Sequence, residues 1–272
     1  MAVNTFKFLE GLDRDIQDSL LKQLRDLWTH TSTAMEGNAL TLGETKFILD
    51  EGLTVSGKPV KDHQEVIGHA KAIELIYSFI GRDIKEQDLF ALHKAVQTDF
   101  INDIYKPYGA WKIEPNGTYA LDDKGKQVYI EYAQPADVPA LMQEIITCIN
   151  TAAHSPITLE TAPASYAKIH AAIAHTHPFW DGNGRIARLL SNLPLLNSGL
   201  PPLVIPRERR RAYIETLARY QLNAGKISVK TGVWPNESML SDFIRFCQDA
   251  YTTTQQLVQQ AHDQQRTRHN DV

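Results

Sequence analysis

Residues 177–188 read His-Pro-Phe-Trp-Asp-Gly-Asn-Gly-Arg-Ile-Ala-Arg, and no other part of the chain is as dense in reactive side chains. The two glycines around Asn183 stand where a loop should become a helix. Free amides at a helix N-terminus bind anions, and glycine lets the backbone approach a phosphate closely. Arg185 and Arg188 are three positions apart and therefore share one helical face. Two guanidinium groups beside such amides predict a polyphosphate site.

Three kinds of residue in this stretch indicate phosphoryl or nucleotidyl transfer. His177 has an ordinary pKa of about 6.5 and can accept a proton near neutrality. Asp181 is a hard oxygen ligand, placed to hold a magnesium ion that bridges phosphate oxygens. The remaining residues form the phosphate cradle. The residues expected to bind phosphate are Asp181, Gly182, Asn183, Gly184, Arg185 and Arg188.

The same letters allow a second interpretation, the metal site of a metal-dependent hydrolase. His175, His177 and Asp181 follow a His-x-His pattern with a carboxylate, which is a known ligand set. This alternative leaves the Gly-Asn-Gly and both arginines without a role, so phosphate binding is favoured. His170 and His175 are expected to be structural. Residues expected in the core are Phe179, Trp180, Ile186, Leu189 and Leu190.

The composition is that of an ordinary soluble protein. The chain has 272 residues, 43% of them hydrophobic and 22% charged, with a formal net charge of -4. This charge provides no overall basic field for nucleic acid. Cys148 and Cys247 form no Cys-x-x-Cys pair and are expected to be buried, reduced thiols. With no apolar run long enough to span a membrane, we expect a cytoplasmic protein that binds neither nucleic acid nor membrane.

Hydrophobic periodicity predicts a mainly α-helical fold. The first helix, 13–28, is followed by an interruption at 31–41, where Gly37 and Asn38 suit a helix end. Thr41 should cap the next helix, with Glu44 completing a capping box. Residues 207–211, rich in arginine, should be a solvated helix start. Helices are expected at 13–28, 41–50, 62–80, 85–98, 136–152, 160–175, from the central stretch to 197, at 207–222, and from 238 onward.

The segment 105–133 differs from the helical pattern. It contains turn residues and then Val128-Tyr129-Ile130, which favour strand, so it predicts a β-hairpin. Beyond about Thr253 the apolar positions thin out, and this tail should be frayed or exposed.

Residues 52–59 have the spacing of a phosphate-binding P-loop. Pro59, however, stands where such a loop needs a Ser or Thr hydroxyl for magnesium. We therefore interpret the segment as a turn between helices.

The pattern His-Pro-Phe-x-Asp-Gly-Asn-Gly-Arg-x-x-Arg resembles the signature of the Fic domain family, with nine matching letters in twelve positions. The resemblance implies a Fic-type helical bundle with one β-hairpin flap. It divides the chain into an N-terminal helical region (1–58), a catalytic core (59–252) and a polar tail (253–272). It also implies an AMP transferase that uses ATP and Mg²⁺ to modify a Ser, Thr or Tyr hydroxyl of a target protein and releases pyrophosphate.

The resemblance assigns roles to single residues. His177 would deprotonate the attacking hydroxyl, Asp181 would hold magnesium, and Arg188 with Arg185 would neutralise the β- and γ-phosphates. Phosphorylating relatives commonly have Lys at the position of Gly184, so this glycine favours AMP transfer.

A second match lies upstream, where Ser32-Thr33-Ala34-Met35-Glu36-Gly37 resembles the inhibitory motif of the family. Glu36 would pair with Arg188, and its carboxylate would then occupy the guanidinium that otherwise binds the γ-phosphate of ATP. In some relatives the same Glu helps water remove AMP, so a de-AMPylating hydrolase, or transfer of another phosphate-linked group, stays an alternative. The inhibitory residues are Ser32, Glu36 and Gly37.

Weaker expectations concern the rim of the site. Val128, Tyr129 and Ile130 resemble the flap that docks the target segment. Tyr213 would stand near the adenine, with Gln221 or Asn223 beside it, although an insertion at 225–237 obscures this part. The sequence does not determine the oligomeric state, and a homodimer is one possibility.

Overall fold

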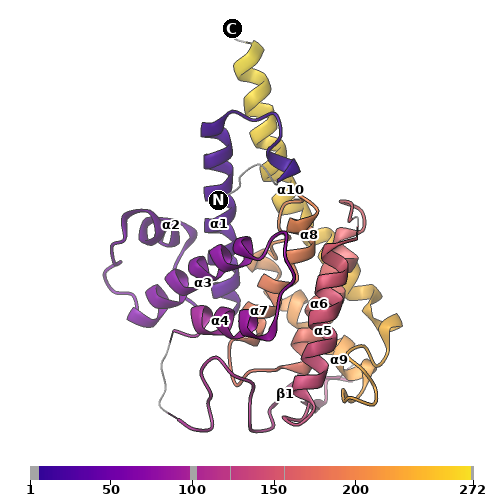
Figure 1. Cartoon of the computed structure of the whole chain (residues 1–272). Helices are drawn as coiled ribbons and strands as arrows, with labels where there is room; N and C mark the ends of the chain where they lie inside the picture. The colour runs from indigo at the N-terminus through magenta and orange to yellow at the C-terminus, as the bar shows by residue number, and fades with distance from the viewer. Residues whose placement is uncertain (1–5, 99–102, 123, 156, 271–272) are drawn as a thin grey trace.

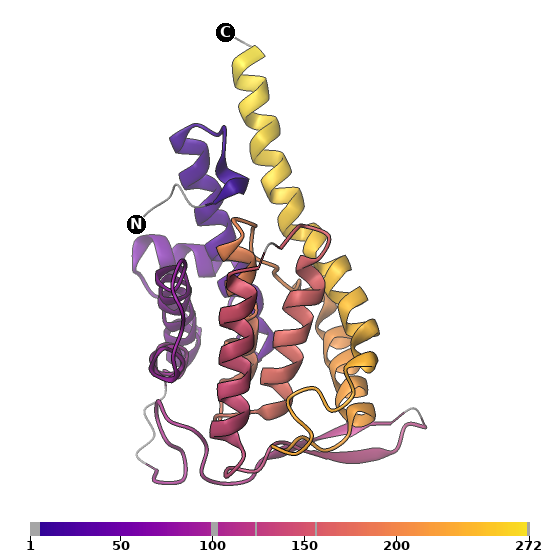
Figure 2. The ribbon, with the colours of Figure 1, turned by 45° about the vertical axis from the view of Figure 1, so that its right-hand side comes forward.

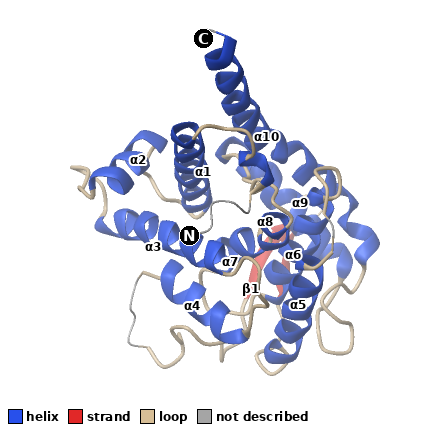
Figure 3. Ribbon diagram, turned by 45° about the horizontal axis from the view of Figure 1, so that its top comes forward, coloured by secondary structure: helices blue, strands red, loops and turns tan. Residues whose placement is uncertain are grey.

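The computed structural model describes residues 6–98, 103–122, 124–155 and 157–270. Small parts of three predicted segments lie outside the described residues. They are residues 1–5 of the N-terminal region, residue 123 of the flap and residues 271–272 of the tail. The described part is mainly helical with one antiparallel hairpin, so the predicted fold class is confirmed (Figure 1 and Figure 3). The elements are η2 (Lys7–Leu9), α1 (Arg14–Met35), α2 (Leu42–Glu51), α3 (Val60–Ser78), α4 (Glu86–Val96), β1 (Gly117–Leu121), β2 (Gln127–Glu131), α5 (Val138–Ala153), α6 (Ala162–Thr176), α7 (Asn183–Leu190), α8 (Leu193–Asn197), η3 (Arg207–Arg209), α9 (Arg210–Ala224), η4 (Glu237–Leu240) and α10 (Ser241–Asn270).

Helix α1 is longer than predicted. Its first half buries Ile16, Leu20 and Leu24 at four-residue spacing. Residues 29–35, rich in Thr and Ser, were expected to interrupt the helix from residue 31, which is wrong. They stay helical because they are buried where α1 packs on α3 and α7, and such packing outweighs weak helix propensity. Gly37, with a φ of 99°, follows the helix end.

Helix α2 begins as predicted. The Thr41 hydroxyl accepts a hydrogen bond from the Glu44 amide at 3.2 Å, and the Glu44 carboxylate accepts one from the Thr41 amide at 2.7 Å. Residues 52–59 connect α2 to α3 without a preceding strand, so the P-loop interpretation is rightly rejected.

Helix α6 lies in the centre of the bundle, with α5, α7, α8 and α10 packed against it (Figure 2). Helix α7 follows after a short loop, and every residue of α7 except Gly184 is buried. The arginines of the central stretch are thus held inside the protein. The two cysteines are free; Cys247 is buried and Cys148 half-buried.

The tail prediction is wrong in one respect, because α10 continues without a break to Asn270. Figure 1 shows it extending from the body of the bundle beside the start of α1. Ala261 and Gln265 are buried there, and the Gln265 side-chain oxygen accepts a hydrogen bond from the Asp13 amide at 2.7 Å. Contacts with the N-terminal segment order this polar stretch. In the described part of the chain, no helix is long and apolar enough to cross a membrane.

Strands β1 and β2 pair from Gly117 opposite Glu131 to Leu121 opposite Gln127. Helix α9 packs against β1, which brings the hairpin over the end of the bundle that holds the central stretch.

Candidate active site

A cleft of about 830 Å³ contains many of the predicted site residues. Its walls are the C-terminal end of α1, the hairpin with Tyr132, the loop after α6, the start of α7, and α9. A cavity of this size is typical of a small-molecule site. The predicted residues that line it are Glu36, His177, Gly184, Arg188, Tyr213, Gln221 and Asn223.

His177 ends α6 with a left-handed backbone (φ of 49°), an unusual conformation for a residue other than glycine. Its ring stacks on Tyr132 at 3.9 Å, and its Nδ1 lies 3.3 Å from the carbonyl oxygen of Ala174. A proton on Nδ1 would bond that carbonyl and leave Nε2 as the acceptor. Burial, reinforced by the ammonium of Lys112, lowers the pKa of His177 to about 3. The imidazole is therefore neutral at physiological pH.

The loop after His177 is fixed by Asn183. The Asn183 side chain accepts a hydrogen bond from the Phe179 amide at 2.8 Å and donates one to the Phe179 carbonyl at 2.9 Å. Phe179 is buried and stacks on His93 at 4.2 Å. Because both polar atoms of the Asn183 side chain bond the Phe179 backbone, only its backbone amide could contribute to the predicted phosphate cradle. Trp180, expected in the core, is only half-buried, with Lys106 over its ring.

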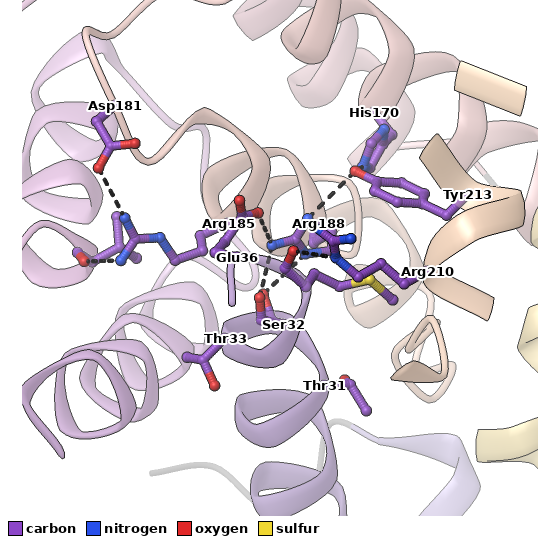
Figure 4. Close-up of polar contacts among 12 residues, drawn as sticks. Thr31, Ser32, Thr33, Glu36, His170, Asp181, Arg185, Arg188, Arg210 and Tyr213 are labelled. Carbon is purple, nitrogen blue, oxygen red and sulfur yellow. Dashed lines mark hydrogen bonds and ion pairs between the residues drawn. The ribbon is translucent and has the colours of Figure 1, made fainter. Parts of the chain in front are cut away.

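The residues of the predicted phosphate cradle lie at the start of α7, of which Gly184 and Arg188 line the cleft. Gly182 has a φ of 77°, which suits glycine, and the amides that follow begin the helix. Asp181 is exposed there, and its carboxylate lies 3.3 Å from Arg185. Arg185 is buried and donates to the Val96 carbonyl at 2.7 Å, so its side chain is directed away from Arg188 (Figure 4). The structure thus does not bring the two arginines to one cavity wall: Asp181, Gly182, Asn183 and Arg185 are not among the residues lining the cleft.

Arg188 is the centre of a polar cluster formed with α1 (Figure 4). Its Nε donates to the Ser32 hydroxyl at 3.0 Å, and its Nη2 donates to the Ser32 carbonyl at 2.8 Å. The same Nη2 lies 2.6 Å from the Glu36 carboxylate. Burial opposes the charge on Glu36, but the Arg188 guanidinium outweighs it and holds the pKa of Glu36 below its ordinary value. The pairing expected from the upstream motif is present.

Gly184 leaves the space in which the Glu36 carboxylate lies. A Cβ at position 184 would stand 2.5 Å from Oε1 of Glu36 and 3.1 Å from Nη1 of Arg188. Gly37, the third residue of the predicted inhibitory set, makes no contact of this kind; its amide donates to the Ala34 carbonyl at 3.1 Å.

Tyr213 and Gln221 lie in α9, which lines the cleft beside Arg188 of α7. The Tyr213 hydroxyl lies 3.4 Å from Nη1 of Arg188 and 3.2 Å from Nε2 of His170. Gln221 donates to the Ala174 carbonyl at 3.2 Å, the same oxygen that His177 faces. Both residues therefore support the arginine and the histidine from the side of α9.

The hairpin meets the cleft mainly through its first strand, and the role of β2 as the flap stays a prediction. The strand that lines the cleft is β1, through residues 118–121, together with Asp122 after it, whereas Val128, Tyr129 and Ile130 of β2 are not among the lining residues. The ring of Tyr129 packs against that of Tyr119 of β1 in a tilted arrangement, with the ring centroids 5.1 Å apart.

Sequence reasoning missed three residues. Lys112 and Tyr132 lie behind and against His177, and neither belongs to a recognisable motif. Arg210 was expected to be solvated, but its Nε donates to the Met35 carbonyl at 2.8 Å, at the end of α1.

The alternative metal site loses support. Among the described residues, no group of three or more His, Cys, Asp or Glu side chains is arranged to hold a metal ion. His175 is buried, which lowers its pKa to about 4, and its ring packs edge-on against Tyr220, as expected of a structural residue.

The Fic/DOC family model matches residues 83–195, which include the His177 loop and α7. The chain is 30% identical over 203 residues to Protein adenylyltransferase fic-1 of Caenorhabditis elegans, an alignment covering 73% of this chain and 37% of that relative. It is 31% identical over 226 residues to Protein adenylyltransferase Fic of Drosophila yakuba, covering 82% of this chain and 39% of that relative. The chain thus spans less than half the length of these relatives.

Two solved structures share the fold. A Fic domain-containing signalling protein from Bacteroides thetaiotaomicron superimposes with a TM-score of 0.80 at 26% identity, over 96% of this chain and 95% of that one. Fic-1 from Caenorhabditis elegans gives a TM-score of 0.70 at 24% identity, over 95% of this chain and 69% of that one, which shows the fold alone. Residues 83–195 therefore form a Fic/DOC family domain, in a chain distantly related to protein adenylyltransferases.

Proposed function

We propose that the chain is an autoinhibited protein adenylyltransferase, which transfers AMP from ATP to a hydroxyl of a target protein. One observation carries the proposal: His177 and Arg188 line one cleft, and the Glu36 carboxylate lies against Arg188 at 2.6 Å. A neutral base and a buried arginine in one cleft suit nucleotidyl transfer. Glu36 is paired with the Arg188 guanidinium, the group that would bind the γ-phosphate.

In the active state, in which the Glu36 carboxylate has left Arg188, the target hydroxyl gives its proton to Nε2 of His177. Its oxygen forms a bond to the α-phosphorus of ATP, and the bond from this phosphorus to the bridging oxygen breaks. AMP remains on the target and pyrophosphate leaves. Arg188 and the amides at the start of α7 would bind the phosphate oxygens on which charge accumulates.

Asp181 would hold magnesium. Its side chain is 54% exposed at the start of α7, and its contact with Arg185 is long at 3.3 Å. Magnesium is often bound by one or two protein carboxylates together with substrate phosphates, so a single carboxylate fits. When bound, the ion would neutralise phosphate charge.

Inhibition would follow from the charge on Arg188. The guanidinium already has Ser32 and Glu36 as acceptors, so a γ-phosphate must displace the Glu36 carboxylate to bind it. Until then ATP can bind only in a pose unsuited to transfer.

The test is intact mass spectrometry of the protein after incubation with ATP and Mg²⁺. We expect Glu36→Gly to gain one or more AMP groups, at a rate at least ~10-fold above wild type, because freeing Arg188 restores a charge-assisted bond in the transition state. Glu36→Gln, which keeps the shape and loses the charge, should give a smaller rise.

Two controls define the outcome. His177→Ala in the Glu36→Gly protein should abolish the modification. Glu51→Gly, an exposed glutamate at the end of α2, should leave it at the wild-type level. No AMP on any variant, with or without candidate targets, would refute transfer; equal labelling of wild type and Glu36→Gly would refute inhibition.

One feature favours a second candidate, removal of AMP from a modified target. Glu36 lines the same cleft as His177, so its carboxylate could orient a water molecule there. Incubating an AMP-modified target with wild type and with Glu36→Gly would decide the question, since a hydrolase that uses Glu36 loses AMP release in the variant.

A further inference from the structure

Lys112 is a buried lysine directly behind His177. It lies in the segment before β1 and is only 2% exposed. Its backbone amide donates to the Pro178 carbonyl at 2.8 Å, and its Nζ lies 3.4 Å from the Thr176 carbonyl. One residue therefore contacts the carbonyls on both sides of His177.

The ammonium of Lys112 is buried, and protein oxygens take the place of water as its hydrogen-bond acceptors. Its Nζ donates to the Asn116 side-chain oxygen at 2.5 Å, and it lies 6.0 Å from the ring of Tyr132, which stacks on His177. Asn116 in turn donates to the Phe179 carbonyl at 3.2 Å. Lys112 and Asn116 thus hold the whole 176–179 loop, including the left-handed backbone of His177, a conformation that needs support from its surroundings.

We infer that Lys112 is the positioning residue of His177: its charged side chain fixes the strained loop that carries the imidazole. The inference rests on the proposed role of His177 as the base. It explains why a lysine is buried here, since a neutral side chain would make weaker bonds to the Thr176 carbonyl and to the Asn116 side-chain oxygen.

Among the described residues, three charged or titratable groups face His177. Lys112 stands behind it, Glu36 approaches from α1, and Tyr132 covers one face of the ring. Burial lowers the pKa of Lys112 to about 8 and raises that of Tyr132 to about 12. Of these groups, only Lys112 changes charge between pH 7 and 9.

This difference gives a test that a purely structural role would not pass. In the Glu36→Gly protein we expect the labelling rate to fall above about pH 8, as Lys112 loses its proton. Lys112→Arg, which stays charged, should remove this alkaline limb. Lys112→Gln should be slower at every pH, by roughly tenfold or more, because a misplaced base loses much of its effect. Lys126→Gln, at the exposed turn of the hairpin, is the matched control and should behave like its parent.

A second measurement does not depend on activity. NMR signals of the His177 imidazole, assigned by their loss in His177→Ala, should shift with a midpoint near pH 8 in the wild type and not in Lys112→Gln. Signals that stay constant from pH 7 to 9, or an alkaline limb that persists in Lys112→Arg, would overturn the inference. An imidazole that responds to Lys112 in a protein that never gains AMP would instead refute the proposed function and leave the Lys112–His177 coupling intact.

Discussion

Gly184 shows how a single missing side chain shapes the site. The position lies in the first turn of α7, where alanine would be favourable for the helix. A Cβ there would meet the Glu36 carboxylate at 2.5 Å. The absence of this atom is therefore what lets Glu36 reach Arg188.

We predict that Gly184→Ala raises the pKa of Glu36 toward its ordinary value, because the methyl group moves the carboxylate away from the Arg188 guanidinium that lowers it. NMR titration of the glutamate side chains would measure it. Gly43→Ala is the control, because a Cβ at that helical position meets nothing within 4 Å. A Glu36 pKa that stays equally low in Gly184→Ala would show that the two groups fit beside a methyl.

Residues with a motif could be predicted from the sequence, and residues that act through the fold could not. The letters around His177 and Glu36 indicated a site and an ion pair, and the structure brings Glu36 and Arg188 together. Asn183 appeared to belong to the phosphate cradle, yet its side chain bonds Phe179. Lys112 has no local pattern at all, because its contacts depend on where a distant loop packs.

The C-terminal end of α1 is held at several points by other elements. Ser32 contacts Arg188 of α7, and the Met35 carbonyl accepts a hydrogen bond from Arg210 of α9. These carbonyls belong to the last turn, whose carbonyl oxygens have no N–H donors within their own helix. The arginines thus fix both the end of the helix and the residue after it, Glu36. The same burial explains why propensity misplaced the end of α1: Thr and Ser form poor helix in isolation, but here they pack between helices.

We predict that Arg210→Ala loosens this end of α1. Loss of one partly exposed charged hydrogen bond should cost about 1 kcal/mol and raise labelling with AMP roughly fivefold, less than Glu36→Gly does. Hydrogen exchange of the amides at 33–38 should quicken in parallel. Arg211→Ala is the control, since that side chain is 90% exposed and pairs with Glu215. Exchange that stays unchanged in Arg210→Ala would contradict the prediction.

Across the whole molecule, buried histidines couple stability to pH. Burial lowers the pKa of His93 and His175 to about 4 and that of His170 and His177 to about 3. The unfolded chain binds protons near pH 6.5, so between these values it holds more protons than the folded chain. The contribution of these neutral histidines to the free energy of unfolding is fully present above about pH 6.5. It is lost as the pH falls toward 3.

We therefore predict a steep loss of thermal stability on acidification, with up to about 1.4 kcal/mol per pH unit for each histidine that stays neutral. Calorimetry between pH 7 and 4.5 would measure it. His175→Leu should reduce the slope, whereas His154→Gln, exposed at the end of α5, should not. A melting temperature independent of pH in this range would contradict the account.

Glu36 and Arg188 are 152 residues apart but belong to one chain. The ion pair therefore forms at an effective concentration set by the fold, which dilution leaves unchanged. A phosphate that competes for Arg188 does so at its own concentration in solution. The balance between the two acceptors thus follows the supply of nucleotide and is independent of how much of the protein is present.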